Sequence, residues 1–214
     1  SFVHLWVGFD AAGLPRDLDG HHTVFLNASL SDATPVDAPG NMVIVCIASL
    51  FDPDLAPPGK HLVHAYAAAN VDPAPFLLDD EELYDERKAA ALERLWEALE
   101  VIIPDIRARS DMVVGGTPRS HAQWNRRHRG TYGPTTFSDG RTPLRNLYTV
   151  GDSNFPGIGI PAVAASACLV ANCIAGPKAH AARLAEMRSA GTLRAGTDWW
   201  GLARDRRPPS LPGG

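Results

Sequence analysis

The residues with the strongest capacity to bind a ligand lie in one stretch of the sequence, LYTVGDSNFPGIGIPAVAASACLVANCI at 147–174. There an apolar segment ends in a glycine and an acidic residue, a glycine-rich turn follows, and small residues then suit a helix. From this order we expect the ligand-binding positions to be Gly151, Asp152, Gly157, Gly159, Ile160, Pro161 and Ala162.

Each part of this pattern has a physical use. Gly157 and Gly159 carry no side chain where a ligand would approach the backbone. A helix that begins near Pro161 leaves the N–H groups of its first turn unpaired at the positive end of the helix dipole, which suits an anionic or electron-rich group. Asp152 could accept hydrogen bonds from sugar hydroxyls. A plain strand-to-helix turn packed on a sheet explains the same spacing, so both interpretations stay open at this point.

Other side chains with chemical potential form weaker patterns. His61 and His64 are three residues apart on an expected strand, so they face opposite sides and, together with His4, do not predict a metal site. Ser166 lacks the GxSxG surroundings of a nucleophile elbow. Three cysteines in apolar surroundings are too few for a disulfide scaffold or a zinc site, and they favour a reducing compartment. They are Cys46, Cys168 and Cys173, of which we interpret the last two as core.

A local basic cluster spans Arg126–Arg129. It predicts either an anion site or a solvated loop whose charges pair with carboxylates. Tyr132 follows in the sequence RGTYGP and could line a ligand pocket, although a tyrosine in a glycine-rich turn is usually structural.

The elements that must position these residues are readable from hydrophobic periodicity. Alternating or continuous apolar residues predict four strands, at 2–9, 22–27, 42–51 and 61–69. The third is nearly all apolar, so we expect it to be buried on both faces. The short connections between the strands favour an antiparallel or mixed sheet over repeated βαβ units.

Helical spacing and capping residues predict the remaining elements. A helix over 79–103 would be capped by Asp79 with Glu82 as its capping-box partner, and Pro104 would end it. A strand near 108–115 would lead to Thr117, the cap of a basic helix that runs to about Arg127. Further expected elements are a buried strand at 147–153 and helices at 161–174 and 178–189.

Composition excludes several classes of protein. The chain has 214 residues, of which 20 are Lys or Arg and 24 are Asp or Glu, so its net charge of −4 argues against a nucleic-acid binder. No apolar run reaches the ~18 residues that a membrane span needs. The sequence does not begin with Met and opens with SFVHLWVGFD, the pattern of the middle of a strand. We therefore expect a processed or partial polypeptide.

Three motifs resemble those of a known family. GDSNFPGIGIPAVAAS at 151–166 resembles the C-terminal flavin-binding signature of the carotenoid (prolycopene) isomerase and phytoene desaturase group of FAD-dependent oxidoreductases. FDPDLAPPGKHLVHAY at 51–66 and GTPRSHAQWNRRHRGTYGP at 116–134 are similar to two earlier segments of that family, in the same order. The resemblance covers about residues 1–175. The retinol saturase branch is a close competitor.

The resemblance implies an FAD cofactor and a role for each matched position. It implies that Gly151 and Asp152 lie by the ribityl-diphosphate portion, and that the Gly159–Ala162 turn lies against the isoalloxazine ring. Ala167 departs from the family, which usually has glycine there. The family's N-terminal βαβ unit with GxGxxG is absent from this sequence, so the resemblance implies the C-terminal half of such a flavoprotein, which by itself would not retain FAD.

These inferences combine into one expected organisation. The fold class is mixed α+β, with a largely antiparallel sheet, covering helices and the C-terminal strand-turn-helix of an FAD-binding fold. We expect a substrate-domain-like region at 1–146, a flavin-contacting region at 147–190 and an extended tail at 191–214. Trp199 and Trp200 in this tail would serve as partner contacts.

The resemblance implies redox-neutral cis–trans isomerisation of a poly-cis carotene with reduced FAD. The partners would be a polyene substrate and an N-terminal half or other complex subunits, in the plastid stroma or at the thylakoid periphery. No nucleic acid or transmembrane helix is expected, and peripheral membrane contact stays open. The alternatives are a non-catalytic subunit of a photosynthetic membrane complex and a retinol saturase-like polyene oxidoreductase.

Overall fold

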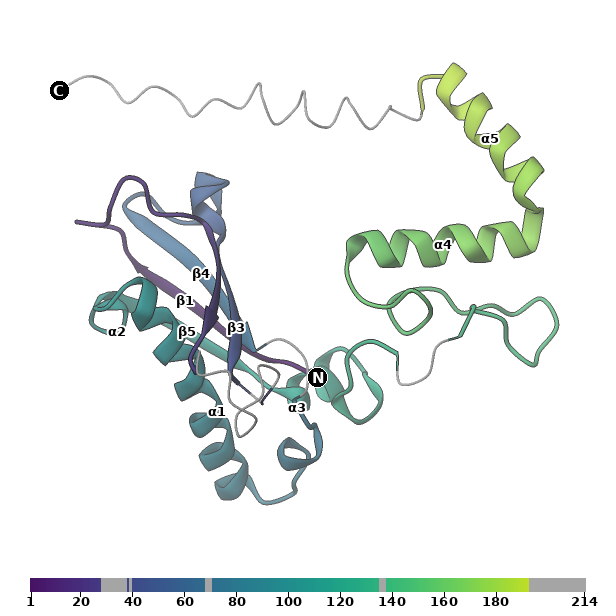
Figure 1. The fold of residues 1–214 in the computed structure, drawn as a ribbon. Coiled ribbons are helices and arrows are strands. Elements are labelled where there is room, and N and C mark those ends of the chain that lie inside the picture. The colour runs from purple at the N-terminus through teal and green to yellow at the C-terminus, as the bar shows by residue number, and fades with distance from the viewer. Residues whose placement is uncertain (28–37, 39, 68–70, 135–137, 193–214) are drawn as a thin grey trace. The chain divides into compact units, whose positions relative to one another are not determined.

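The computed structural model describes residues 1–27, 38, 40–67, 71–134 and 138–192 (Figure 1). The chain divides into two compact units, Ser1–Thr135 (unit 1) and Thr136–Gly214 (unit 2). The tail with Trp199 and Trp200 lies outside the described residues, so its expected role as a partner contact stays a prediction.

Unit 1 is built on a five-stranded sheet with the order β2-β3-β4-β1-β5. Every pair of neighbouring strands is antiparallel. The strands are β1 (Val3–Asp10), β2 (His21–Phe25), β3 (Met42–Ile47), β4 (Lys60–Ala67) and β5 (Ser110–Gly116). The expected mixed α+β class with an antiparallel sheet is therefore confirmed.

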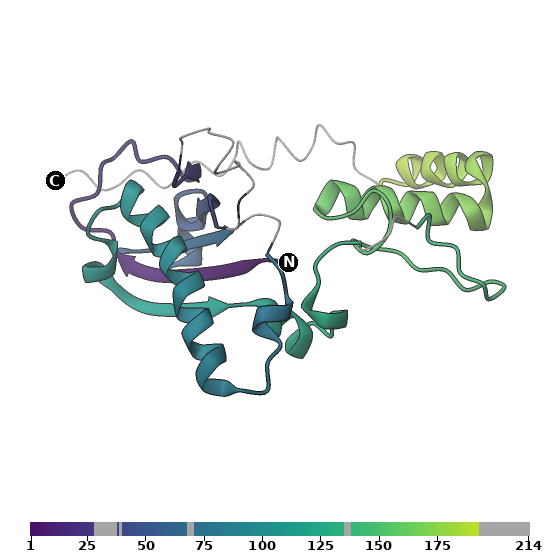
Figure 2. The same cartoon turned by 60° about the horizontal axis from the view of Figure 1, so that its bottom comes forward.

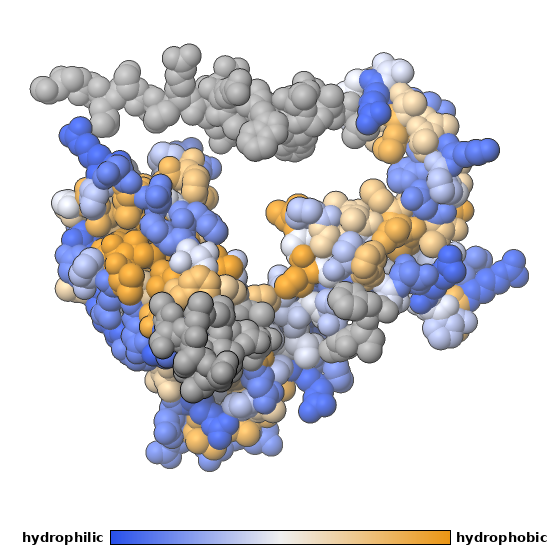
Figure 3. All heavy atoms as spheres, viewed as in Figure 1, coloured by the Kyte–Doolittle hydropathy of each residue, from blue (hydrophilic) through white to orange (hydrophobic). Residues whose placement is uncertain are grey.

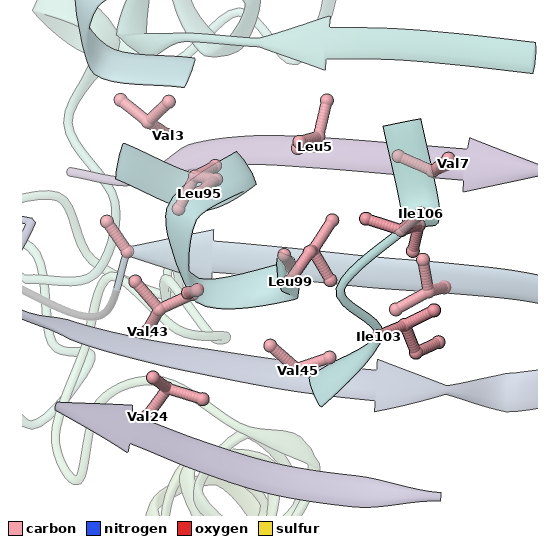
Figure 4. Packing of buried hydrophobic residues seen from close by; sticks show 14 of the residues in the cluster. Val3, Leu5, Val7, Val24, Val43, Val45, Leu95, Leu99, Ile103 and Ile106 are labelled. Carbon is pink, nitrogen blue, oxygen red and sulfur yellow. The ribbon is translucent and has the colours of Figure 1, made fainter. Parts of the chain in front are cut away.

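One face of this sheet forms the hydrophobic core. In β1 every second side chain is buried, because successive residues of a strand point to opposite faces. The same alternation in β3 and β4 places valine, isoleucine and alanine on the core side. Figure 4 shows Leu95 and Leu99 of helix α1 (Glu81–Ile102) and the following Ile103 and Ile106 packed against this face. In Figure 2, α1 crosses the sheet on that side.

The helix over the core begins one residue later than its capping pattern predicts. The cap of α1 is Asp80, whose carboxylate accepts a hydrogen bond from the N–H of Leu83 at 3.1 Å. The predicted cap Asp79 with Glu82 as its box partner was therefore wrong. The residue three positions after the actual cap is Leu83, which has no carboxylate to complete a capping box. The helix ends where expected, with Ile103 as its C-terminal cap before Pro104.

Strand β3 is shorter and less buried than its apolar sequence predicts. It ends at Ile47, and the chain continues as two short 3-10 helices, η1 (Ala48–Leu50) and η2 (Pro53–Leu55). Its core face is buried but its other face is only half-buried, so burial on both faces was wrong. The reason is that α1 covers one face of the sheet only. Beyond the strand, the side chain of Phe51 is 68% exposed.

The connection from the core to the end of unit 1 passes through short elements. The 3-10 helix η3 (Ala74–Phe76) precedes α1, and helix α2 (Ile106–Arg109) precedes β5. Helix α3 (Pro118–Trp124) begins with a capping box between Thr117 and Ser120, as the sequence predicts for its start. The helix stops at Trp124 and not near Arg127, because Arg126 adopts a left-handed backbone conformation with φ of 54°. The 3-10 helix η4 (His128–Gly130) follows.

Unit 2 contains the two expected helices, α4 (Ile160–Ala175) and α5 (Pro177–Ser189). The expected buried strand at 147–153 is not formed. Within the described residues of unit 2, this segment forms only an isolated bridge between Arg141 and Tyr148. A strand needs a neighbouring strand that pairs with its backbone N–H and C=O groups along its length. Leu147 and Val150 are accordingly 50% and 55% exposed.

No single helix of the described residues is long and apolar enough to cross a membrane. Helices α4 and α5 meet that test of length and composition only as a pair, bent by 113°.

Candidate functional site

The glycine-rich turn of unit 2 has a backbone that side chains other than glycine rarely adopt. Gly151 and Gly159 have φ values of 126° and 98°, both in the region that favours glycine. A Cβ added at Gly151 would meet nothing within 4 Å, and at Gly159 it would only reach Pro161 at 4.0 Å. The glycines are therefore required by conformation, and the space beside them is open within unit 2.

The N-terminus of α4 presents unpaired backbone donors. The N–H of Val163 is bonded to the carbonyl of Gly159 at 2.9 Å, but within the described residues the N–H groups of Ile160 and Ala162 have no acceptor. The Ile160 side chain is 88% exposed. Because α4 is 16 residues long, its dipole adds positive potential to these donors. The arrangement can hold an anionic or electron-rich group against the backbone.

The turn is tied to the helix behind it. The hydroxyl of Ser166 accepts a hydrogen bond from the N–H of Gly151 at 3.2 Å, and its side chain is buried. Ser166 is thereby a structural residue of the turn. The Asp152 side chain is half-buried at the same place, and Asn154 accepts a hydrogen bond from Thr149 at 3.0 Å. These bonds fix the loop from which a ligand would be contacted.

The small and apolar residues of α4 are largely uncovered in unit 2. Figure 3 shows apolar side chains gathered along this helix. Ala164, Ala167, Cys168 and Cys173 are exposed, so the interpretation of the two cysteines as core is wrong for unit 2. The reason is that no described element of unit 2 packs over that side of α4. Its contact with flavin or another backbone stays a prediction.

Unit 1 carries a second concentration of functional side chains, on the sheet face opposite the core. We call it the aromatic wall: Phe2, His4, Trp6, His64, Tyr66, His121 and Tyr132. Trp6 and His64 are direct partners in the β1–β4 register and stack with centroids 4.6 Å apart at 3°. His64 and Tyr66 also stack, at 5.1 Å. Tyr132 packs edge-on against Phe2 at 4.8 Å.

Three imidazoles of the aromatic wall form a hydrogen-bonded chain. Nδ1 of His4 lies 3.0 Å from Nε2 of His64, and Nε2 of His4 lies 3.1 Å from Nε2 of His121. The Asn125 amide nitrogen donates to Nδ1 of His121 at 3.3 Å. A neutral imidazole has one donor and one acceptor nitrogen. With Asn125 as donor, His121 donates to His4 and His4 donates to His64, which leaves the last proton on Nδ1 of His64.

The surroundings keep this chain neutral. Burial, followed by the charges of His64 and His121, lowers the pKa of His4 to about 3. Burial also lowers the pKa of His64. The pKa of His121 is lowered by burial first and then by Arg127 and the Ser1 ammonium. A protonated imidazole would lose an acceptor nitrogen, so neutrality and the two hydrogen bonds support each other.

The sequence predicted only part of this wall. His61 does point away from His64, as its spacing predicts, and its Nδ1 bonds to Ser49 at 2.8 Å. The contact of His121 with His4, 117 residues apart, was missed. A signal was present, because ring-bearing residues alternate at i, i+2 in both strands, as His4 and Trp6 and as His64 and Tyr66.

Two further features bear on ligand binding, namely possible metal ligands and the basic cluster Arg126–Arg129. Within the ranges that the structure describes, no group of three His, Cys, Asp or Glu side chains is arranged to hold a metal ion. The guanidinium of Arg127 lies over the Tyr132 ring, 5.1 Å from the ring centroid. Arg126 and Arg129 are exposed. The choice between an anion site and a solvated loop stays open there.

Sequence and structure comparisons relate this chain to known proteins. No family model matches the sequence. Prolycopene isomerase of Arabidopsis thaliana is 31% identical over 185 residues, which are 82% of this chain and 30% of that protein. Prolycopene isomerase 2 of an Oncidium hybrid cultivar is 30% identical over the same shares. A solved oxidoreductase from Methanosarcina mazei is 21% identical with a TM-score of 0.44, covering 80% of this chain and 34% of that one.

The expected resemblance to carotenoid isomerases is therefore confirmed at the level of sequence. The chain spans about 30% of the length of the curated relatives it matches, and over 82% of its own length it is homologous to the prolycopene isomerases.

Proposed function

We propose that this chain is the flavin-contacting and substrate-facing C-terminal portion of a carotenoid cis–trans isomerase-like flavoprotein. The observation that carries the proposal is the 185-residue match to prolycopene isomerases, which covers 82% of this chain. The chloroplastic relatives make a plastid the proposed location. A position in the stroma or at the thylakoid periphery belongs to the same proposal.

The turn of unit 2 has the properties that an FAD site requires. The glycines at 151 and 159 leave open space beside the backbone, whereas Gly157 is buried, and the free N–H groups of Ile160 and Ala162 suit the electron-rich edge of a flavin. Asp152 would bind hydroxyls of the ribityl chain. When bound, reduced FAD supplies electron density that lowers the order of a double bond in a conjugated chain. The residues of this chain orient the two molecules and exclude water.

The isolated chain should bind FAD weakly. Unit 2 offers one carboxylate and two backbone donors, and each net hydrogen bond contributes about 0.5–1.5 kcal/mol, or about 1.5–3 kcal/mol when charged. Association costs roughly 4–15 kcal/mol of translational and rotational freedom. A few such bonds do not offset this cost, so the remaining contacts must come from the portion that the relatives have in addition.

The test is complementation. The chain is produced alone and together with the part of Arabidopsis prolycopene isomerase that it does not match, and retained flavin is measured by absorbance after gel filtration. We expect flavin in the pair and little in the chain alone. Conversion of prolycopene by the reduced pair is followed by chromatography. Micromolar or tighter binding of FAD by the chain alone, or a stable pair without flavin, would contradict the proposal.

Two alternatives are outcomes of the same experiment. A chain that never takes up flavin but purifies in fixed ratio with a pigment–protein complex of photosynthetic membranes would be a structural subunit. A pair that holds flavin and reduces a double bond of retinol without isomerising prolycopene would be a retinol saturase-like oxidoreductase. The poly-cis carotene is the substrate that we propose, because prolycopene is named in the matched relatives.

A further inference from the structure

The aromatic wall lies on a sheet face that carries no charge over its middle. From β3 to β5 the residues on this side are apolar, aromatic, glycine, cysteine or neutral histidine. They are Met42, Ile44, Cys46, Leu62, His64, Tyr66, His4, Trp6, Gly8, Met112, Val114 and Gly116. On these described strands the charged side chains of this face occur only at the ends, where Lys60 pairs with Asp111 at 2.8 Å. A long hydrocarbon can therefore lie across the face without removing water from a charged group.

The rings in the middle of the wall are stacked on one another. Trp6 stacks on His64 with centroids 4.6 Å apart at 3°, and His64 stacks on Tyr66 at 5.1 Å and 28°. His4 stacks on Trp6 at 5.1 Å and 18°. Because the faces of these rings cover one another, a ligand on this side meets their edges. An aromatic ring is electron-rich on its faces and carries positive partial charge at its edge, so the wall offers positive partial charge to a ligand.

Three hydrogen-bond donors at these edges have no partner within the described residues: the N–H groups at Nε1 of Trp6 and Nδ1 of His64, and the hydroxyl of Tyr66. The proton on Nδ1 of His64 follows from the order of donors along the imidazole chain. Burial, followed by Cys46 and Tyr132, raises the pKa of Tyr66, so its hydroxyl keeps its proton. No buried side-chain nitrogen or oxygen of the described residues lacks a hydrogen bond, so these three donors reach the surface.

Fixed donors of this kind act on charge that appears only during a reaction. In the proposed function, the conjugated chain takes up electron density from the reduced flavin while a double bond rotates. It returns that density when the bond forms again, so no electron is gained or lost overall. The polyene is therefore uncharged before and after the step and negatively charged during it. Donors that are already in place stabilise the charged state more than the uncharged one, and this difference lowers the barrier.

The neutrality of the imidazoles allows a hydrocarbon to bind before the charge appears. An imidazolium covered by a hydrocarbon would lose its water without gaining a counter-charge, whereas a neutral N–H loses much less. Burial lowers the pKa of His4 to about 3 and also lowers the pKa of His64, so both rings are neutral near pH 7. The wall can therefore hold a hydrocarbon and still donate hydrogen bonds when negative charge develops on it.

We propose that Trp6, His64 and Tyr66 are catalytic residues that contact the hydrocarbon polyene and stabilise its negative charge while a double bond rotates. The N–H groups of Trp6 and His64 and the hydroxyl of Tyr66 donate to the electron-rich face of the conjugated chain. The proposal deepens the proposed function and rests on it for the reaction and for the hydrocarbon substrate. It assigns the wall to the transition state of that reaction, because the uncharged substrate gains little from these donors.

The first test uses the full 214-residue chain and three conjugated probes that differ in charge. A pentamethine oxonol carries a delocalised negative charge, as the rotating polyene would, whereas diphenylhexatriene is neutral and a pentamethine cyanine carries a delocalised positive charge. Binding is followed by fluorescence anisotropy. We expect Trp6→Phe and Tyr66→Phe, which each keep a flat ring and remove one donor, to weaken oxonol binding about 3- to 10-fold. Binding of diphenylhexatriene should change less than about twofold, and cyanine binding should not weaken.

Matched variants separate the donors from general effects. Trp124→Phe removes an indole N–H at a tryptophan that is 77% exposed on α3, and it should leave the binding of all three probes unchanged. His64→Phe should weaken oxonol binding as the other two variants do. It also removes the acceptor of His4, so urea unfolding of this variant shows whether the fold is retained. Each variant is compared with the parent chain for the same probe, which cancels the effect of the net charge of −4.

The second test measures conversion of prolycopene by the chain complemented with the unmatched part of Arabidopsis prolycopene isomerase. In Trp6→Phe and Tyr66→Phe we expect kcat to fall about 3- to 10-fold, with KM within about twofold of the parent value. Flavin retention should stay unchanged. A higher KM with an unchanged kcat would mean that the wall only binds the uncharged substrate, which would overturn the catalytic assignment.

The remaining outcomes distinguish this inference from the proposed function. Equal losses of oxonol and diphenylhexatriene binding, or no binding of oxonol by the parent chain, would overturn the assignment of the donors. Flavin complementation and prolycopene conversion would then still support the proposed function. A chain whose variants lose only oxonol binding, but which never restores flavin binding, would support the wall and contradict the flavoprotein proposal.

Discussion

Nδ1 of His4 lies 3.0 Å from Nε2 of His64, and the two residues belong to neighbouring strands whose register places Tyr66 opposite His4 and Trp6 opposite His64. The hydrogen bond is therefore diagonal, between residues two positions apart on the same face. Cross-strand diagonals of this kind are within reach of long or aromatic side chains. The bond links β1 to β4 and continues to α3 through His121.

Acidification should destabilise unit 1 through this cluster. The pKa of His4 is lowered from 6.5 to about 3, so the unfolded chain binds more protons than the folded one between these values. Stability is fully present above pH 6.5 and falls as the pH decreases, by up to about 1.4 kcal/mol for each pH unit for this group. Urea unfolding at several pH values checks the sign and the slope.

The variant His4→Phe isolates that effect. It should lower stability at pH 7, by about 1–3 kcal/mol for the lost hydrogen bonds, and flatten the pH dependence below 6.5. His180→Phe serves as the control and should keep the slope of the parent chain. An unchanged slope in His4→Phe would show that other groups cause the acid sensitivity.

Gly159→Val should abolish flavin retention by the complemented pair. Valine is strained at a φ of 98°, and its side chain would stand beside the free N–H groups of α4. Gly13→Val is the control, because Gly13 also has a positive φ, 75°, with nothing within 4 Å of an added Cβ. Both variants carry backbone strain. A loss of flavin in both would therefore mean that lower stability, and not a change at the glycine-rich turn, causes the effect.

Ala164→Leu tests what covers α4. Ala164 is exposed in unit 2, so the substitution should change the stability of the chain alone by less than about 0.5 kcal/mol. If flavin or another backbone packs on this face in the assembled protein, the same leucine should cost roughly 1–3 kcal/mol there and reduce complementation. Equal complementation by the variant and the parent would mean that this face stays uncovered.

Leu95→Ala should be the most destabilising of these changes. Leu95 is fully buried between α1 and the sheet, and truncation of such a side chain costs about 2–5 kcal/mol. Leu55→Ala, at a residue 51% exposed, should cost far less. Chemical denaturation followed by circular dichroism measures both, and similar losses would contradict the described core.

The sequence predicted the fold well where a local pattern of residues determines the secondary structure. The apolar patterns of β1 and β4 identified both as strands, and the run from Leu83 to Ile102 identified α1. The cap was misplaced by one residue because Asp79 and Asp80 are chemically equal choices. The strand predicted at 147–153 was wrong for a different reason. A strand depends on a neighbouring strand, which its own sequence does not specify.

In the candidate site too, local patterns were predicted and long-range contacts were missed. The glycine-rich turn was predicted from adjacent residues, and the structure adds its backbone geometry and the free N–H groups. The imidazole chain joins His4, His64 and His121 from three separate elements, so no local spacing could predict the contacts. It depends on the register of β1 with β4 and on the path of the chain from β5 into α3.

In the strand order of the sheet, β5 is an edge strand. Three successive apolar side chains on it are exposed: Met112 (43%), Val113 (50%) and Val114 (51%). Such a border offers backbone donors and acceptors to any extended chain that approaches it, and apolar side chains strengthen the attachment. Two copies could join there through strand addition. Self-association would then grow with protein concentration, so dilution series should accompany every binding titration of this chain.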